Sequence, residues 1–178
     1  MTLVEKIVAL HRALAAAAIP HAFGGALALA WCTQQARGTN DIDLNVFLGA
    51  GDLDALVAAL PRGVKVTAED RQLLTRDGQA RVWWGETPVD VFLNTSPFHE
   101  ELELRAVDEA FGGEHVPFLS CRDLAVFKAF FNRTRDWADL EAMAEAGTLD
   151  VGAVLGVIAE YLGADDDRVA RLRTLRRS

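Results

Sequence analysis

The first part of the chain switches between the helical and the strand-like spacing of apolar residues. Apolar positions three and four residues apart predict a helix over residues 3–18, and a second, apolar on most sides, over residues 26–34. Between them, residues 21–23 form a short apolar strand. Residues 41–48 then alternate polar and apolar side chains, as expected for a strand with one face in a core.

Strand patterns dominate the middle of the chain. Asp52 is a natural N-cap for a helix that ends near Leu60, and Asp77-Gly78 predicts a tight hairpin between two of the strands that follow. The segments with strand composition are residues 64–67, 72–76, 79–84, 87–93, 102–107 and 115–119.

The last third is predicted to be helical throughout. Ser120 and Asp123 resemble a capping box that opens a helix, whose apolar face continues to Leu140. Two further helices are expected over residues 151–162 and 165–175. The pattern therefore predicts an α/β (α+β) fold with two parts, an α/β core over residues 1–119 and a helical subdomain over residues 120–178.

Composition excludes several classes of protein. The 178 residues are half apolar, and the longest apolar run is too interrupted for a membrane span, so no membrane partner is expected. A net charge of −8 argues against binding nucleic acid through the whole surface. Cys32 and Cys121 are far apart and show no metal-ligand spacing, which favours a reducing, cytoplasmic location.

Three acidic residues stand out against this background. Asp41 and Asp43 lie two apart in an apolar strand and so share a face, and Asp90 is isolated in another apolar strand. A lone Asp-x-Asp pair could be two solvated acids at a strand end, but three acids in apolar strands need a cation. They suit two Mg²⁺ ions, with Mn²⁺ as an alternative, and Asp90 would act as a ligand or as a general base.

Several motifs together resemble the polymerase-β-type nucleotidyltransferase superfamily. They are Gly24-Gly25, then Arg-x-Thr-x-Asp-Ile-Asp-Leu ending at Leu44, and a later Val-Asp-Val-Phe around Asp90. The helical run from Leu124 to Leu140 further resembles the AbiEii and MenT-type nucleotidyltransferase toxins of toxin–antitoxin systems. The resemblance implies a polymerase-β-like mixed sheet with helices, followed by the helical part, and a transferase of the EC 2.7.7 type.

The resemblance also assigns roles to individual residues. It implies that Asp41, Asp43 and Asp90 bind metal and that Gly24 and Gly25 hold the nucleotide phosphates. On the helical half, the toxins' lysine matches Lys128, which would contact the triphosphate as a catalytic residue. The basic and acidic residues that follow it are also expected to bind nucleotide, namely Arg133, Asp136 and Asp139.

The motif leaves open whether Asp136 or Asp139 is the site residue. On one straight helix, at 100° per residue, Asp139 falls on the same stripe as Lys128, and Asp136 lies farther round. A straight helix therefore favours Asp139, and only a distortion near Asn132 would favour Asp136. The stripe could also be no more than the solvated face of an amphipathic helix.

Thr39 lies two residues before Asp41, at the mouth of the expected metal site. Its hydroxyl could contact a nucleotide phosphate. A phosphate attached to Thr39 would compete with the incoming nucleotide by charge and by volume. The sequence therefore suggests Thr39 as a regulatory phosphorylation site that silences the protein.

The acceptor of the transferred nucleotide is the least specified part of the prediction. The resemblance implies transfer from CTP or another pyrimidine NTP to the 3′ end of tRNA, by a toxin that blocks translation and has a cognate antitoxin. One alternative is an enzyme that modifies an aminoglycoside or lincosamide antibiotic, and another is a non-catalytic binding module. The basic residues available for tRNA are Arg71, Arg76, Arg81, Arg168, Arg171, Arg173, Arg176 and Arg177.

Overall fold

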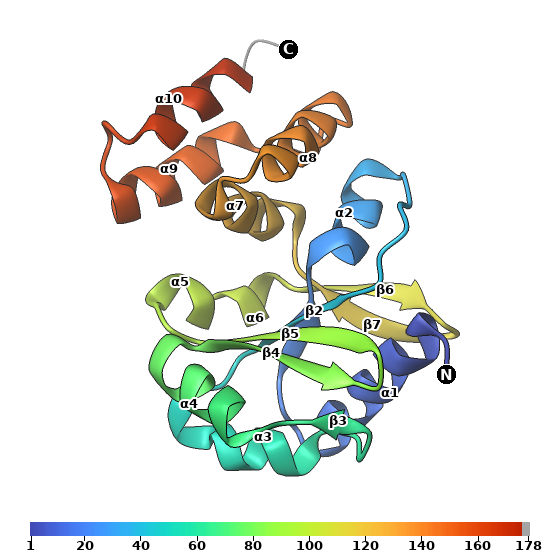
Figure 1. Cartoon of the computed structure of the whole chain (residues 1–178). Coiled ribbons are helices and arrows are strands. Elements are labelled where there is room, and N and C mark those ends of the chain that lie inside the picture. The colour runs from blue at the N-terminus through green and yellow to red at the C-terminus, as the bar shows by residue number, and fades with distance from the viewer. Residues whose placement is uncertain (176–178) are drawn as a thin grey trace. The chain divides into compact units, whose positions relative to one another are not determined.

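The computed structural model describes residues 1–175, and it divides the chain into two compact units. An α/β unit comprises residues 1–25 and 38–119, and a helical unit comprises residues 26–37 and 120–175 of the described chain (Figure 1). The predicted boundary after Leu119 coincides with one of these limits. Residues 26–37, which were expected in the core domain, group with the helical unit instead.

The α/β unit is built on a mixed sheet in which seven strands are described, in the order β3-β4-β5-β2-β1-β7-β6. The central pair β2–β5 is parallel, whereas β2 pairs antiparallel with β1, and β5 with β4. This mixed α/β arrangement confirms the predicted fold class. The strands are β1 His21–Phe23, β2 Ile42–Val46, β3 Val64–Lys65, β4 Gln79–Trp84, β5 Thr87–Leu93, β6 Val107–Phe111 and β7 Glu114–Phe118.

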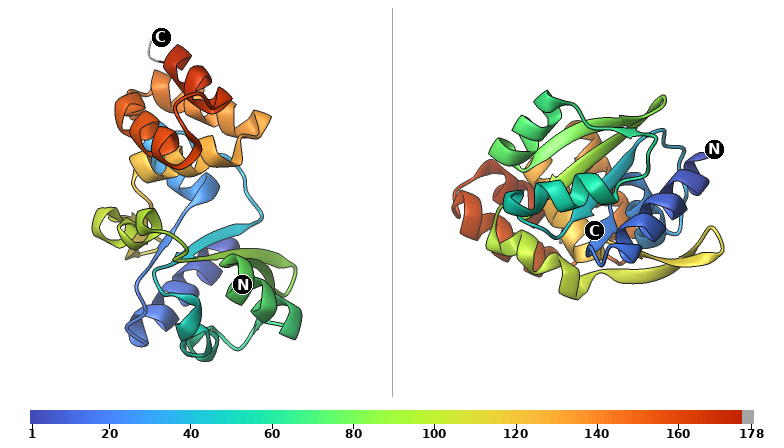
Figure 2. Two further views of the ribbon diagram at one scale, coloured as in Figure 1. Left: turned by 90° about the vertical axis from the view of Figure 1, so that its left-hand side faces the viewer. Right: turned by 90° about the horizontal axis from the view of Figure 1, so that it is seen from below.

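Three helices of this unit lie together on one face of the sheet, as Figures 1 and 2 show: α1, α3 and α4. Two short helices, α5 and α6, follow β5. The helices of the unit, with one 3-10 turn, are α1 Leu3–Ala16, η1 Ala50–Asp52, α3 Leu53–Ala59, α4 Ala68–Asp77, α5 Pro97–Glu100 and α6 Leu102–Arg105.

Strand β2 has the two-faced character that its sequence predicts. Ile42, Leu44 and Val46 are fully buried, and their register partners on β5 are buried as well. The intervening Asp43 is only partly buried. Because side chains alternate along a strand, the core holds the apolar set and the carboxylate faces the other side.

Two segments predicted as strands are helical, and the reasons are local. Residues 72–76 belong to α4, which begins with a capping box between Thr67 and Asp70 and ends at Gly78 with a φ of 69°. Asp77-Gly78 is thus a helix C-terminus and not a hairpin, because a left-handed glycine serves either purpose. Residues 102–105 form α6, closed by the helical bond from the Ala106 N–H to the Leu102 carbonyl at 3.0 Å.

The helical unit contains α2 and the last four described helices. Ser120 caps α7 by accepting a hydrogen bond from the Asp123 N–H, as predicted. Fully or almost fully buried side chains from α8, α9 and α10 form its core, among them Trp137, Leu140, Ile158 and Leu172. The helices are α2 Gly25–Thr33, α7 Cys121–Phe131, α8 Thr134–Glu145, α9 Val151–Leu162 and α10 Asp167–Thr174.

Of the two alternatives left open for residues 128–139, the structure has the distortion near Asn132 and not the straight helix. Helix α7 ends at Asn132, whose φ of 56° lies in the left-handed region, and α8 starts two residues later. The Asn132 side chain stabilises this break by accepting a hydrogen bond from Trp137 Nε1 at 2.7 Å. Asparagine tolerates the left-handed conformation better than most residues, so one position converts a long helix into a helix pair.

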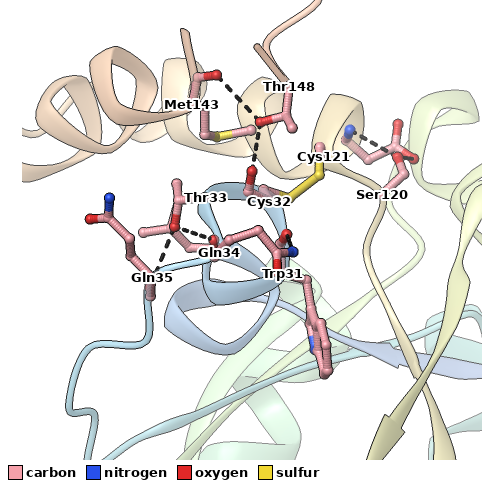
Figure 3. Close-up of a disulfide and its surroundings, with 11 residues drawn as sticks. Trp31, Cys32, Thr33, Gln34, Gln35, Ser120, Cys121, Met143 and Thr148 are labelled. Atoms are coloured by element: carbon pink, nitrogen blue, oxygen red, sulfur yellow. Dashed lines mark hydrogen bonds between the residues drawn. A yellow bond between two sulfur atoms is a disulfide. The ribbon is translucent and has the colours of Figure 1, made fainter. Parts of the chain in front are cut away.

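Cys32 and Cys121 form a disulfide between the end of α2 and the start of α7 (Figure 3). Their Cα atoms are 5.6 Å apart although 89 residues separate them in sequence. Beside the bridge, the Thr148 hydroxyl donates to the carbonyl oxygen of Cys32 at 2.9 Å. The inference of a reducing location treated the two cysteines as unrelated, and this pairing removes that support. Among the described residues, no helix is long and apolar enough to cross a bilayer.

Candidate active site

The three residues Asp43, Asp90 and Arg81 lie side by side on adjacent strands and are called here the charged row. Asp43 on β2 is the register partner of Asp90 on β5, and Asp90 is the register partner of Arg81 on β4. Register partners point to the same face of a sheet. The topology therefore gathers two acids, distant in sequence, beside one base.

Arg81 forms a bidentate ion pair with Asp90. Its Nε and Nη2 atoms donate to Oδ1 and Oδ2 at 2.7 and 2.6 Å. This hydrogen bonding raises the pKa of Arg81 above its usual value; partial burial acts in the opposite direction, and the charges of Asp90, Asp41 and Asp43 add to the increase. All three predicted metal-binding acids thus act on one guanidinium group.

Asp41 is the third predicted metal ligand, and its partner is Thr39. The Thr39 hydroxyl donates to the Asp41 carboxylate, while the Asp41 N–H approaches the hydroxyl oxygen at 3.4 Å. This is a local turn of the kind that threonine stabilises. Thr39 therefore contacts one of the three predicted metal ligands directly.

Gly24 and Gly25 directly follow the neighbouring strand β1 and lie against Asp43. The Gly24 N–H donates to the Asp43 carbonyl at 2.9 Å. Gly25 begins α2 with a φ of +56°, and a Cβ atom there would lie only 1.8 Å from Oδ2 of Asp43. Glycine is required at this position both by the backbone conformation and by the close approach of the carboxylate.

These residues suit a divalent cation by donor type. Carboxylate oxygens are the ligands that Mg²⁺ and Mn²⁺ prefer, and Asp43 and Asp90 occupy paired positions with Asp41 two residues from Asp43. Within residues 1–175, however, no three His, Cys, Asp or Glu side chains are gathered closely enough to hold an ion. In this arrangement the counter-ion of Asp90 is the Arg81 guanidinium.

The helical unit contains a separate buried ionic cluster around Lys128. The Lys128 ammonium donates to Asp139 Oδ2 at 2.6 Å and lies 3.9 Å from Asp136 Oδ1. All three side chains are buried. The break at Asn132 folds α8 back against α7, so that Asp136 and Asp139 both face Lys128. The structure therefore does not select one of these two acids over the other.

Arginines complete this cluster from its rim. Arg133 donates to Asp136 through Nε at 2.7 Å; although burial acts to raise it, this bond and the neighbouring charges hold the pKa of Asp136 below its usual range. Arg37 binds both oxygens of Asp139. No role was expected for Arg37, although it opens the Arg-x-Thr-x-Asp motif.

Arg81 was expected to contact tRNA, and the structure pairs it with Asp90 instead. The signal that could have shown this is Gly85-Glu86, because a hairpin turn there places residues 81 and 90 opposite each other. The hairpin was expected at Asp77-Gly78, so the pairing was missed.

The other arginines proposed for tRNA binding are also mostly engaged. Arg71 and Arg76 lie on α4, not on strands, and pair with Asp54 and Asp77. In the helical unit, Arg168 pairs with Asp166, and the Arg171 guanidinium lies 4.2 Å from the centre of a Trp137 ring. Arg176 and Arg177 lie outside the described residues.

Comparison with solved structures supports the fold. The antibiotic-resistance factor ANT(2″)-Ia, in complex with adenylyl-2″-tobramycin, matches with a TM-score of 0.60 and 18% identity over 99% of this chain and 98% of that one. Its solution structure matches with a TM-score of 0.56 and 20% identity, covering 98% and 90%. An antigenic nucleotidyltransferase-like protein from Paracoccidioides brasiliensis matches with a TM-score of 0.52 and 18% identity, covering 96% and 92%.

Comparison of the sequence identifies the family. No curated protein matches the chain. The family model described as "Nucleotidyl transferase AbiEii toxin, Type IV TA system" matches residues 8–177, which is nearly the whole chain. The chain therefore belongs to the AbiEii family of nucleotidyltransferase toxins.

Proposed function

We propose that this nucleotidyltransferase transfers a nucleoside monophosphate from a pyrimidine triphosphate, CTP foremost, to the 3′ end of tRNA. As a toxin it would thereby block translation. The observation that carries nucleotidyl transfer is the pairing of Asp43 with Asp90 beside the glycine that begins α2, whereas the choice of CTP and tRNA rests on the resemblance to the AbiEii and MenT-type toxins. Paired carboxylates and helix-start N–H groups are what metal-dependent transfer to a hydroxyl uses.

Asp41, Asp43 and Asp90 would hold divalent cations, Mg²⁺ or Mn²⁺. When bound, such ions neutralise the charge of a triphosphate and lower the pKa of an acceptor hydroxyl. Asp90 is the candidate to accept the proton of that hydroxyl if it is not itself a ligand. The N–H groups at Gly24 and Gly25 would orient the triphosphate, since glycine lets the backbone approach a phosphate closely.

In the helical unit, Lys128 is the proposed triphosphate contact. A buried lysine that is ion-paired with two aspartates is held in one direction, which suits a residue that must meet an anion without reorganising. Asp136 and Asp139 would position it, and Arg133 and Arg37 in turn hold these aspartates. This role rests on the family match and on the ion pairs within the unit.

The proposed acceptor is tested by incubating the protein with labelled CTP, Mg²⁺ and total RNA, and in parallel with tobramycin in place of the RNA. We expect label on the 3′ end of tRNA, with CTP and UTP used better than ATP and GTP. Label on tobramycin alone would replace tRNA by a cationic drug as the acceptor. An absence of transfer to either acceptor, with any of the four nucleotides, would leave only a binding function.

We further propose that phosphorylation of Thr39 silences the enzyme. The Thr39 hydroxyl already contacts the Asp41 carboxylate, so a phosphate there adds about two negative charges beside a site that must receive a triphosphate. After co-expression with the product of the neighbouring gene, mass spectrometry should find phosphate on Thr39 and not on the exposed Thr95. Phosphatase treatment should restore transfer. A silenced protein that carries no phosphate on Thr39 would contradict the proposal.

A cognate antitoxin and the cytoplasm complete the proposed setting. The family description names a type IV toxin–antitoxin system, which supports an antitoxin partner. Both proposed substrates, a nucleoside triphosphate and tRNA, are cytoplasmic molecules. In that compartment the Cys32–Cys121 disulfide would either persist or be reduced.

A further inference from the structure

The charged row contains a positive charge that the proposed chemistry does not use. Asp43 and Asp90 occupy paired positions on neighbouring strands, and two adjacent carboxylates repel each other unless a cation lies with them. Arg81 supplies that cation from the next strand, because it is the register partner of Asp90. The row is therefore neutralised in part by the protein itself.

The ion pair with Arg81 occupies the Asp90 carboxylate, which a metal ion would need as a ligand. Both oxygens of Asp90 accept from the guanidinium, at 2.7 and 2.6 Å. Mg²⁺ requires carboxylate oxygens at about 2.0–2.1 Å in a nearly ideal octahedron. A divalent cation at the same face of the carboxylate would meet both the guanidinium nitrogens and their positive charge.

The Arg81 side chain is also able to move away from Asp90. Its side chain is 51% exposed, whereas that of Asp90 is 20% exposed, so the guanidinium lies on the solvent side of the pair. The arginine backbone is fixed within β4, between the buried Ala80 and Val82. The long side chain can therefore move into solvent without disturbing the sheet.

We propose that Arg81 is an internal counter-ion that competes with the divalent cation for Asp90. Without metal, Arg81 holds the carboxylates of the charged row in place; when the cation binds, the guanidinium releases Asp90. The inference rests on the proposed metal role of the acids. It adds that Arg81, which is not a metal ligand, lowers the affinity of the charged row for metal. In the metal-free protein, Arg81 also keeps the acids of the row together.

The test measures Mn²⁺ binding without nucleotide, by the electron paramagnetic resonance signal of free Mn²⁺. The proteins are the wild type, Arg81→Gln and, as a matched control, Arg76→Gln. Arg76 lies in the same unit, loses the same charge on substitution and pairs only with Asp77 in the contacts described here. We expect Arg81→Gln to bind Mn²⁺ about tenfold more tightly than the wild type, and Arg76→Gln to bind as the wild type does.

Thermal unfolding gives a second measurement on the same proteins. Without metal, Arg81→Gln should have a lower Tm than the wild type, because its carboxylates have lost their counter-ion. Saturating Mn²⁺ should raise the Tm of this variant more than that of the wild type, because the tighter ligand stabilises the folded state more. If Arg81→Gln does not fold, the competition is tested on the wild type by the NMR chemical shift of the ¹⁵N-labelled Arg81 Nε–H group. Adding Mg²⁺ should move this signal to the chemical shift of a solvated guanidinium.

The outcomes separate this inference from the proposed function. Equal Mn²⁺ affinity of Arg81→Gln and the wild type, or an Nε–H signal unchanged by Mg²⁺, would overturn the competition and leave the metal role of the acids intact. The same gain in Arg76→Gln would also overturn it, because net charge alone would then explain the effect. No Mn²⁺ binding by any of the proteins would overturn both proposals.

Discussion

Replacing Asp43 with asparagine is expected to reduce nucleotidyl transfer by about 10³-fold or more, because the loss of a metal-binding carboxylate removes several kcal/mol of transition-state stabilisation. Asparagine keeps the shape of the side chain, so its close approach to Gly25 is preserved. The measurement is the initial rate of label transfer from CTP, together with urea unfolding of the same preparation.

The fold of Asp43→Asn should survive. Asp43 is partly buried next to another carboxylate, so removing its charge relieves a repulsion, and the free energy of unfolding should change by no more than about 1 kcal/mol. Asp54→Asn is the matched control, because Asp54 is an exposed acid of the same unit that pairs with Arg71. Full activity of Asp43→Asn, or equal loss in the Asp54 variant, would refute the assignment of Asp43.

Reduction of the Cys32–Cys121 disulfide should destabilise the helical unit by about 2–4 kcal/mol, because the bridge restricts a long loop of the unfolded chain. Urea unfolding, followed by tryptophan fluorescence to which the buried Trp137 of this unit contributes, should show a midpoint lower by about 1–2 M after treatment with reductant. The double variant Cys32→Ser/Cys121→Ser should match the reduced wild type and should not respond to reductant.

The same experiment bears on the compartment. Cys32 is almost fully buried, at 2% exposure, and Cys121 is partly buried, so the bridge is shielded from a reductant on its Cys32 side. Protein isolated under conditions that trap thiols should therefore retain the disulfide. Two free thiols in that preparation, with no loss of stability on adding reductant, would show that the bridge does not form in the cell.

Much of the local structure could be predicted because it depends on neighbouring residues. The alternation around Asp41 and Asp43 predicted strand β2 and its buried face, and helix α9 falls on the residues predicted for it. Ser120 and Asp123 marked the start of α7. In each case the deciding contact lies within a few residues, so periodicity and capping chemistry are sufficient.

The errors arose where one local signal has two structural uses. Asp77-Gly78 can close a hairpin or end a helix, and only the capping box at Thr67, ten residues earlier, decides between them. Asn132 can continue a helix or break it, and its hydrogen bond with Trp137 favours the break. A left-handed residue ends an element, but it does not say which kind of element.

By itself, the sequence determined the motifs from which the family and the candidate residues were predicted: the Gly-Gly pair, the three aspartates and, through the resemblance to the toxins, Lys128. Only the tertiary structure decided which charges meet. Strand register places Arg81 against Asp90, the break at Asn132 brings both Asp136 and Asp139 to Lys128, and packing joins Cys32 to Cys121. The physical reason is that motifs are local, whereas register, helix pairing and disulfide partners depend on residues far apart in the chain, which approach one another only when the core forms.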